Sequence, residues 1–368
     1  MNVTGTCELS SGKVATSSRN AKIKYGPCSP PGVESAPMVF LVVGDANADL
    51  SSTLARFPDE GDDVAMTALG YSSGGSGANV ATALAKLGAR ARLVTAVGRD
   101  PGADIALQAA RQAGVDLSFV ETHPTQATGH CIVAISPGGE RTFLSFRGAN
   151  AAVACPDFAA VFQDVMHLHV AGHALLEGAQ GTTTLALMEE ARRRDITISL
   201  DVCLPLVRTR ATELLALAPR FSVLFGNTSE LGALAPPDHH ASHEAAMAAL
   251  LAAGVPLVVG KLGANGAVVA EGSTRTFLPA FPADVRDTTG AGDGFVAAFL
   301  YAWRRGASHE HAGRLGNAAG AHVVSRLGAA ASLPGREELL QVISTHGGEL
   351  SSLRILFTDD KPSIGRDT

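Results

Sequence analysis

The sequence predicts an α/β fold in which layers of helices cover a largely parallel sheet. From residue 158 onward, short apolar runs alternate regularly with longer segments of helical periodicity, which is the pattern of successive βαβ units. Hydrophobic residues make up 46% of the 368 residues, whereas aromatic residues make up only 5%. This composition provides a large core and favours close packing of helices on a sheet over an aromatic surface for nucleic acid.

The first strand is predicted at residues 38–43, an apolar run that ends at Gly44. Two polar residues, Asn47 and Asp49, follow this strand. In open α/β sheets, ligands bind beyond the carboxyl ends of the strands. We therefore expect both side chains to lie at the functional edge of the sheet.

A glycine-rich turn at residues 74–79 opens the next element, an amphipathic helix that stops at Gly88. A strand at 93–97 and a helix at 103–113 are predicted to follow.

Residues 117–146 interrupt the alternation of strands and helices. They alternate between apolar and polar side chains around a Pro-Gly-Gly turn, which predicts a hairpin with arms at 132–135 and 142–146. We expect a small β lid made of two insertions, at about 47–72 and 117–148.

The rest of the chain resumes the alternation of strands and helices. Strands are predicted at 165–170, 196–201, 223–225, 256–261 and 266–270. Helices are predicted at 181–194, 210–217, 243–253, 294–303, 309–324 and 336–343. We therefore expect one domain over residues 38–345, a flexible extension at 1–37 and a C-terminal tail at 346–368.

Charge and cysteine content restrict the classes of function. The chain has 29 basic and 35 acidic residues, a net charge of −6 and no basic block, which argues against nucleic-acid binding. No apolar run reaches the ~18 residues that a membrane span needs. The five cysteines are scattered and form no C-x-x-C pair, so we expect neither a disulfide framework nor a zinc site, and a reducing cytoplasmic location.

The run Asp287-Thr-Thr-Gly-Ala-Gly-Asp-Gly-Phe295 is the most informative stretch. A glycine turn that leads into a helix N-terminus offers unpaired N–H groups and the positive end of the helix dipole to an anion. Asp293 would repel an anion, so we interpret it as a base that takes a proton from a hydroxyl beside a phosphate. This combination is the chemistry of phosphoryl transfer to an alcohol. The alternative is an Asp that merely caps a helix.

Two common nucleotide-binding motifs are absent from the sequence. No G-x-x-x-x-G-K-[ST] occurs, so the chain is not a P-loop enzyme. Gly75-Ser-Gly77 is followed by Val80 where the dinucleotide fingerprint needs Gly or Ala. A nicotinamide dehydrogenase is therefore disfavoured.

Four ordered motifs make the chain similar to the ribokinase or PfkB family of carbohydrate kinases. They are the glycine-rich helix start at 74–88, N-x-x-E at 227–230, a glycine loop at 261–266 and the run at 287–295. The similarity extends over about residues 38–340 and leaves out both ends. It implies an α/β, ribokinase-like αβα three-layer domain with a small β-sheet lid, and transfer of the γ-phosphoryl group of ATP to a sugar hydroxyl with Mg²⁺.

The resemblance also implies roles for the residues of the catalytic and sugar sites. Asp293 keeps the role of base, and the N–H groups of Gly290, Ala291 and Gly292 would stabilise the charge on the transferred phosphoryl group. Asp49 would accept hydrogen bonds from two neighbouring sugar hydroxyls. The residues expected to complete the sugar site are Asn47, Gly75, Ser76, Asn79, Arg147 and Asn150.

Further residues are expected to bind the nucleotide and metal ions. Glu230 would hold Mg²⁺ through water, because Mg²⁺ dehydrates reluctantly. Asp287 and main-chain carbonyls near residues 325–330 match the place where relatives bind a monovalent cation, so K⁺ is also expected. The residues expected near the nucleotide are Asn227, Lys261, Gly263, Gly266 and Asn317.

Several of these residues have plain structural alternatives. A helix capping box fits the spacing of Asn227 and Glu230 almost as well. The loop at 261–266 is also compatible with an ordinary hairpin turn, Asn79 with a helix N-cap, and Asn317 with a surface position.

Other polar residues carry weaker expectations. His167, His169 and His173 resemble a metal-binding set, but we interpret them as histidines of the core and of a strand end. Asp201 ends a strand, yet Cys203 departs from the family's D-x-N pattern there, so Asp201 is only a secondary candidate.

Three alternative functions stay open. A nucleoside kinase of the same superfamily would need a pocket for a flat base. A sugar-phosphate kinase would need cationic partners, for which Arg99, Arg141 and Arg147 are the candidates. A non-catalytic sugar-binding regulator would have no use for a base beside an anion site. The resemblance also implies a homodimer formed through the lid.

Overall fold

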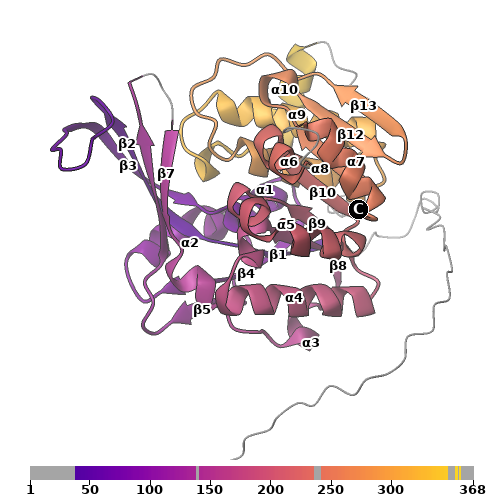
Figure 1. Ribbon diagram of the computed structural model, residues 1–368, viewed down its shortest axis with the longest axis horizontal. Helices are drawn as coiled ribbons and strands as arrows, with labels where there is room; N and C mark the ends of the chain where they lie inside the picture. Colours follow the sequence, from indigo (N-terminus) through magenta and orange to yellow (C-terminus); the bar gives the residue numbers. More distant parts are fainter. Residues whose placement is uncertain (1–37, 138–140, 236–241, 347–352, 355, 358–368) are drawn as a thin grey trace, which may run out of the picture. The chain divides into compact units, whose positions relative to one another are not determined.

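The computed structural model describes residues 38–346, apart from 138–140 and 236–241, together with 353–354 and 356–357. The expected extension at 1–37 and most of the expected tail lie outside the described residues. The described chain forms two sheets, one of nine strands and one of four (Figure 1).

The nine-stranded sheet has the order β13-β12-β11-β10-β9-β8-β1-β4-β5. Its parallel strands are β1 (Val39–Val43), β4 (Arg90–Gly98), β5 (Val120–His123), β8 (Val165–Ala171), β9 (Thr197–Asp201), β10 (Val223–Asn227) and β11 (Leu257–Lys261). Two antiparallel strands, β12 (Ala267–Glu271) and β13 (Thr274–Leu278), extend one edge. All five residues of β1 are apolar and buried, as expected for a central strand covered on both faces.

Helices cover both faces of this sheet, which confirms the predicted three-layer arrangement. Phe40 and Val42 of β1 belong to one core cluster, and Leu41 and Val43 belong to the other, because side chains alternate along a strand. The first cluster includes residues of α1 (Ser76–Lys86), α2 (Gly102–Gln112), α8 (Ala291–Arg304), α9 (His309–Val324) and α10 (Arg336–Thr345). The second includes residues of α3 (Phe158–Val161), α4 (Gly178–Arg193), α5 (Leu204–Leu217), α6 (Thr228–Leu234) and α7 (His243–Ala252).

The four-stranded sheet is the lid, with the order β3-β2-β6-β7. Its strands are β2 (Asn47–Leu54), β3 (Met66–Gly74), β6 (Gly129–Ile135) and β7 (Arg141–Phe146). The predicted hairpin is confirmed, because β6 and β7 pair antiparallel. Residues 120–123, expected in the lid, instead form β5 at the edge of the large sheet and pair with β4. Alternation of side chains predicts a strand there, but not which sheet the strand joins.

Two further differences concern the start of one helix and the presence of one strand. Helix α5 begins at Leu204 rather than at 210, because Pro205 favours the first turn and the chain kinks at Arg210 instead of starting there. Strand β13 was not predicted.

In the part of the chain that the structure describes, no helix is both long and apolar enough to cross a bilayer.

Candidate active site

The N-terminus of α8 carries the glycine run. Gly290 precedes the helix with φ of 79°, a left-handed conformation that glycine adopts without strain. The Ala291 N–H donates to the Thr288 carbonyl at 3.3 Å, so the turn itself uses one of the three N–H groups expected to bind an anion. Among the described residues, Gly290 and Gly292 have no acceptor for their N–H groups, and both line a cleft. The anion site therefore rests on these two glycines rather than on Ala291.

Asp293 lies in the first turn of α8 and meets the first turn of α1. Its Oδ1 accepts a hydrogen bond from the Ser76 hydroxyl, and its Oδ2 accepts one from Asn79 Nδ2, both at 2.8 Å. Burial raises the pKa of Asp293 to about 6, although these two hydrogen bonds act to lower it. The two glycine motifs thus converge on one carboxylate whose pKa suits a general base near neutral pH.

Asp49 reaches the same place from strand β2 of the lid. A Cβ at Gly74 would lie 2.0 Å from Asp49 Oδ2, so only glycine at that position leaves room for the carboxylate. Burial, and then the charge of Asp293, raise the pKa of Asp49 to about 7.

Two buried oxygens at this place point to a missing hydrogen-bond donor. Asp49 Oδ1 and Asn79 Oδ1 are inaccessible to solvent and accept no hydrogen bond from any described residue. Buried polar atoms are rarely left unpaired in native proteins. A ligand rich in hydroxyl groups would satisfy both oxygens.

The cleft beside Asp293 has a volume of about 230 Å³ and lies at the carboxyl ends of the parallel strands. Lys261, at the end of β11, projects into it and pairs with Asp201 at the end of β9, with Nζ 2.6 Å from Oδ1 and 2.7 Å from Oδ2. A Cβ at Gly292 would lie 3.3 Å from Lys261 Nζ, which places the ammonium beside the anion site. Burial alone would lower the pKa of Lys261, but Asp201 and Glu230 raise it by more, so the ammonium stays charged.

Asn227 and Glu230 do form the capping box that their spacing allowed. Glu230 N–H donates to Asn227 Oδ1 at 2.9 Å, and Asn227 N–H donates to Glu230 Oε2 at 2.7 Å. Both residues also line the cleft. Burial raises the pKa of Glu230, and Lys261 lowers it only in part. A carboxylate therefore faces the cleft where Mg²⁺ held through water would fit, and that role stays a prediction.

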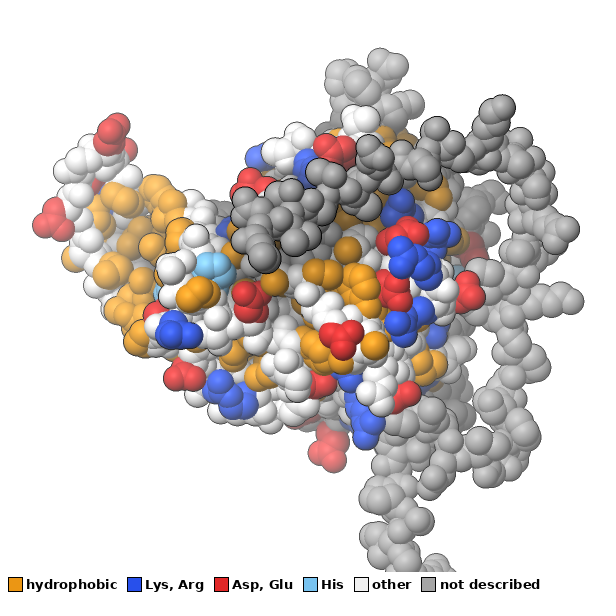
Figure 2. Space-filling view, turned by 90° about the horizontal axis from the view of Figure 1, so that it is seen from below, with side chains coloured by type: hydrophobic (Ala, Val, Ile, Leu, Met, Phe, Trp, Pro, Cys, Tyr) orange, Lys and Arg blue, Asp and Glu red, His pale blue; other side chains and the backbone are white. Residues whose placement is uncertain are grey.

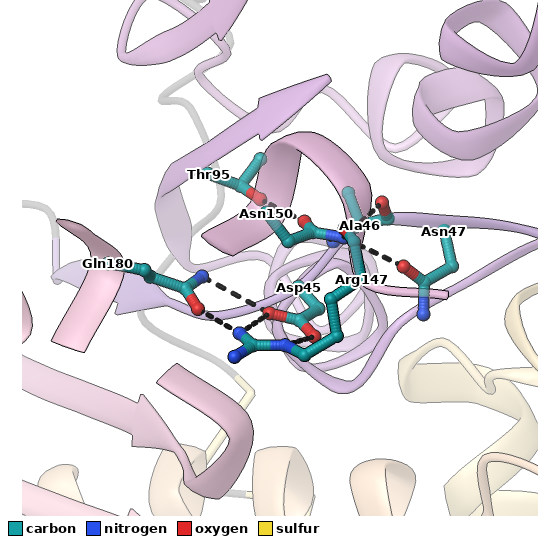
Figure 3. A network of polar contacts seen from close by, with 7 residues as sticks. All are labelled: Asp45, Ala46, Asn47, Thr95, Arg147, Asn150 and Gln180. Carbon is teal, nitrogen blue, oxygen red and sulfur yellow. Dashed lines mark hydrogen bonds and ion pairs between the residues drawn. The ribbon is translucent and has the colours of Figure 1, made fainter. Parts of the chain in front are cut away.

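Asn150, expected to touch the sugar, is instead bonded entirely within the protein (Figure 3). Its Oδ1 accepts from the Ala46 N–H at 2.9 Å and from the Thr95 hydroxyl at 3.0 Å. Its Nδ2 donates to Asn47 Oδ1 at 2.9 Å and to the Arg147 carbonyl at 3.1 Å. No hydrogen-bonding group of this buried amide is left for a ligand, so Asn150 holds Asn47 in place.

Arg147 lies in the same network, where its charge is neutralised (Figure 3). Its Nη2 and Nε lie 3.0 and 3.3 Å from the two carboxylate oxygens of Asp45. Gln180 accepts from Arg147 and donates to Asp45 Oδ1 at 3.2 Å. The three side chains connect the end of β1, the return from the lid and the first turn of α4.

The remaining nucleotide candidates lie around strands β11 to β13. Gly263 and Gly266 form the turn between β11 and β12, where Leu262 N–H donates to the Gly266 carbonyl at 2.8 Å. Asn317 is buried rather than on the surface, and its Nδ2 donates to the carbonyls of Leu278 and Pro279, each at 3.0 Å. Contact of these residues with a nucleotide stays a prediction.

Asp287, where a monovalent cation is expected, already has partners within the protein. Its Oδ1 accepts from Thr289 N–H at 2.9 Å, and its Oδ2 accepts from Gly328 N–H at 3.0 Å. Arg141 Nη2 lies 3.1 Å from Oδ1, so a guanidinium already supplies the positive charge. Burial alone would raise the pKa of Asp287, but these N–H groups and Arg141 lower it overall.

Three further residues, Gly172, His173 and Cys203, line the cleft and were not expected there. His173 lies two residues beyond the end of β8, which agrees with its interpretation as a strand-end histidine but not with a role taken from the motifs. His167 and His169 are buried in the middle of β8, and their rings are hydrogen-bonded to the hydroxyl of Ser199 at 2.8 Å.

Comparisons with known proteins agree with this geometry. A family model described as pfkB family carbohydrate kinase matches residues 40–336. A ribokinase from Arabidopsis thaliana is 30% identical over 340 residues, which covers 90% of this chain and 87% of that protein. An ATP-dependent ribose-1-phosphate kinase from Halopiger xanaduensis is 31% identical over 289 residues, which covers 78% of this chain and 93% of that protein.

The fold comparison gives the same result. The structure of Arabidopsis thaliana ribokinase complexed with ribose and ATP matches with a TM-score of 0.73 and 28% identity. The match covers 83% of this chain and 98% of that one.

Proposed function

The chain belongs to the pfkB family of carbohydrate kinases, and on this premise we propose that it phosphorylates a hydroxyl of a neutral sugar with Asp293 as the base. Members of this family are ATP-dependent phosphotransferases that act on sugar hydroxyls. The observation that carries the proposal is the pair of unsatisfied buried oxygens, on Asp49 and Asn79, beside the Asp293 carboxylate. Together they form an acceptor-rich site next to two free helix N–H groups.

In the proposed reaction, Asp293 accepts the proton of the attacking hydroxyl. That oxygen forms the new P–O bond, and the bond to the departing ADP oxygen breaks. Ser76 and Asn79 occupy one acceptor position on each oxygen of Asp293, and a carboxylate oxygen has a second lone pair for the substrate proton. The hydrogen bonds from Ser76 and Asn79 fix the orientation of the base.

The charge that develops on the phosphoryl group faces positive groups of the chain. Gly290, Gly292 and Lys261 all line the cleft, and the Lys261 ammonium lies beside Gly292. Such preorganised donors stabilise a transition state because they need no reorganisation when charge develops. Mg²⁺ bound with ATP would neutralise further phosphate charge, and we propose that Glu230, which lines the cleft, would hold it through water.

A neutral sugar is favoured over a sugar phosphate because the candidate arginines are already paired. Arg147 is paired with Asp45, and Arg141 with Asp287. Arg99 is exposed and does not line the cleft. A phosphate on the substrate would have to break one of these ion pairs.

The test is an ADP-release assay with ATP and Mg²⁺ over a panel of acceptors. The neutral arm holds ribose, deoxyribose, fructose and 2-keto-3-deoxygluconate. The second arm holds ribose 1-phosphate, fructose 6-phosphate and tagatose 6-phosphate, and the third holds adenosine, cytidine and inosine. Turnover confined to the neutral arm supports the proposal. Faster turnover of a phosphate or a nucleoside would move the assignment to that arm.

We also propose that the lid forms a homodimer. In the lid register, Tyr71, Leu50, Ile132 and Leu144 lie side by side on one face, whereas Asp49 lies on the opposite face. The exposed fractions of Tyr71 and Leu144 are 66% and 56%. Figure 2 shows hydrophobic side chains gathered at the lid end of the protein. A contiguous apolar patch of this kind usually marks an interface, and a second copy would cover it without blocking Asp49.

The dimer is tested by light scattering on the wild type and on Leu144→Glu. Phe277→Glu is the matched control, because Phe277 on β13 is 59% exposed but lies outside the lid. We expect a dimer for the wild type and the control, and a monomer for Leu144→Glu. The proposed setting is the cytosol, where free thiols such as those of Cys131 and Cys203 stay reduced.

A further inference from the structure

The first residue of lid strand β7, Arg141, contacts the loop that leads into the anion site. Its guanidinium lies 3.1 Å from Asp287 Oδ1, donates to the Arg286 carbonyl at 3.2 Å and donates to the Thr288 hydroxyl at 3.3 Å. One side chain of the lid therefore contacts three consecutive residues of the main domain, just before Gly290. The side chains of Arg141 and Asp287 are 14% and 13% exposed, so water screens this pair only weakly.

A metal cation at the same carboxylate would be repelled by Arg141. Each carboxylate oxygen of Asp287 accepts one backbone N–H, from Thr289 or from Gly328, and keeps a second lone pair. A cation bound there would lie within a few ångströms of the Arg141 guanidinium, and two like charges at that distance repel strongly in a partly buried site.

We propose that Arg141 takes the place of a monovalent cation at Asp287, so that the lid rather than the solvent supplies the positive charge. The loop from Asp287 to Gly290 sets the left-handed turn that presents the anion-binding N–H groups. Arg141 is thus a positioning residue that holds this loop through Asp287. Because the charge is carried on β7, it reaches the loop only when the lid lies against it, which couples the position of the lid to the order of the anion site.

The test by turnover rests on the proposed kinase function. The test by melting temperature does not. Turnover and melting temperature are measured for the wild type, Arg141→Ala and Arg141→Lys, in K⁺, Na⁺ or choline at matched ionic strength. Arg56→Ala is the matched control, since Arg56 lies between β2 and β3 of the lid and is paired with Asp62 in the same connection, not with a residue of the loop at 286–290. The double variant Asp287→Asn/Arg141→Ala tests whether any effect of K⁺ on turnover or melting temperature arises at Asp287.

We expect the wild type, Arg141→Lys and the control to be indifferent to the choice of cation. Arg141→Ala should lose turnover about 10- to 100-fold in choline, somewhat less than the loss of an oxyanion donor. K⁺ should restore most of that loss and raise the melting temperature of Arg141→Ala selectively. The double variant should show neither effect.

Two results would overturn the inference. One is a wild type that K⁺ activates or stabilises selectively, because a cation site would then coexist with Arg141. The other is an Arg141→Ala variant whose turnover and melting temperature ignore K⁺. If no acceptor is phosphorylated at all, the proposed function fails, and the melting temperatures alone still decide between Arg141 and a metal cation.

Discussion

The two sides of the site use their polar side chains differently. At the N-termini of α1 and α8, Asn79 keeps a buried oxygen without a partner, and Gly290 and Gly292 keep free N–H groups within the described chain. On the side where the chain returns from the lid, the Asn150 amide is fully bonded and the charges of Asp45 and Arg147 cancel. The first side is built to receive a ligand, and the second is built to hold the first in place. Unused acceptor oxygens and free N–H groups therefore indicate the ligand side. On the other side Arg147 Nη1 is also buried without a partner among the described residues, but the charge of that guanidinium is already neutralised by Asp45.

Among changes on the ligand side, Asp293→Asn should lower kcat the most. The amide keeps the size of the side chain but cannot accept the hydroxyl proton, so kcat should fall by about 10²–10⁴. Asp284→Asn is the control, because Asp284 is exposed and does not line the cleft. The assay is steady-state ADP release at saturating sugar. A loss below about tenfold would mean that Asp293 is not the base.

Lys261→Met should have the next largest effect, a fall in kcat of about 10²-fold, because it removes a positive charge beside the anion site. The variant also leaves the Asp201 carboxylate buried without its partner. Lys261→Met/Asp201→Asn should regain stability but not turnover. Recovery of turnover in the double variant would show that Lys261 acts only through Asp201.

On the side where the chain returns from the lid, substitutions should lower the stability of the protein rather than its turnover. Arg147→Met leaves Asp45 buried and unpaired, and breaking a buried pair of this kind costs about 3–5 kcal/mol. Arg56→Ala removes an exposed pair, which is worth about 0–1 kcal/mol. Denaturant unfolding measures both variants. Equal losses would contradict the contrast between the two pairs.

The smallest expected effect is a pH-dependent gain in stability from Asp49→Asn. The pKa of Asp49 is raised to about 7 in the folded protein, against about 3.9 in an unfolded chain. The folded state therefore binds the proton more tightly, and the stability from that proton is present below about pH 4 and lost as the pH rises through about 7. Asp49→Asn should raise the melting temperature by about 2–4 °C at pH 8 and by less at pH 5, while it slows turnover. A gain that is independent of pH would contradict the raised pKa.

The sequence predicts the layers of the fold and both glycine motifs, because hydrophobic periodicity and glycine turns are local signals. It also predicts that Asp293 and Asn79 belong to one site, since each stands in a motif. It does not predict that they touch, or that Arg147 pairs with Asp45 and Arg141 with Asp287. These contacts join residues 214, 102 and 146 positions apart in the chain (293 − 79, 147 − 45 and 287 − 141). The packing of α8 on α1 decides the first contact, and the position of the lid decides the two arginine pairs. Local sequence signals carry neither, so the partners that Asn150 and Asp287 have within the protein were not foreseen.

The most direct test of a buried carboxylate base is the pH dependence of kcat/KM for the best acceptor of the panel. Burial raises the pKa of Asp293 to about 6. We expect kcat/KM to be constant at alkaline pH and to fall as the pH drops through about 7 to 6, where Asp49 and then Asp293 become protonated. Constant kcat/KM down to about pH 4, the ordinary range of an exposed carboxyl, would contradict it.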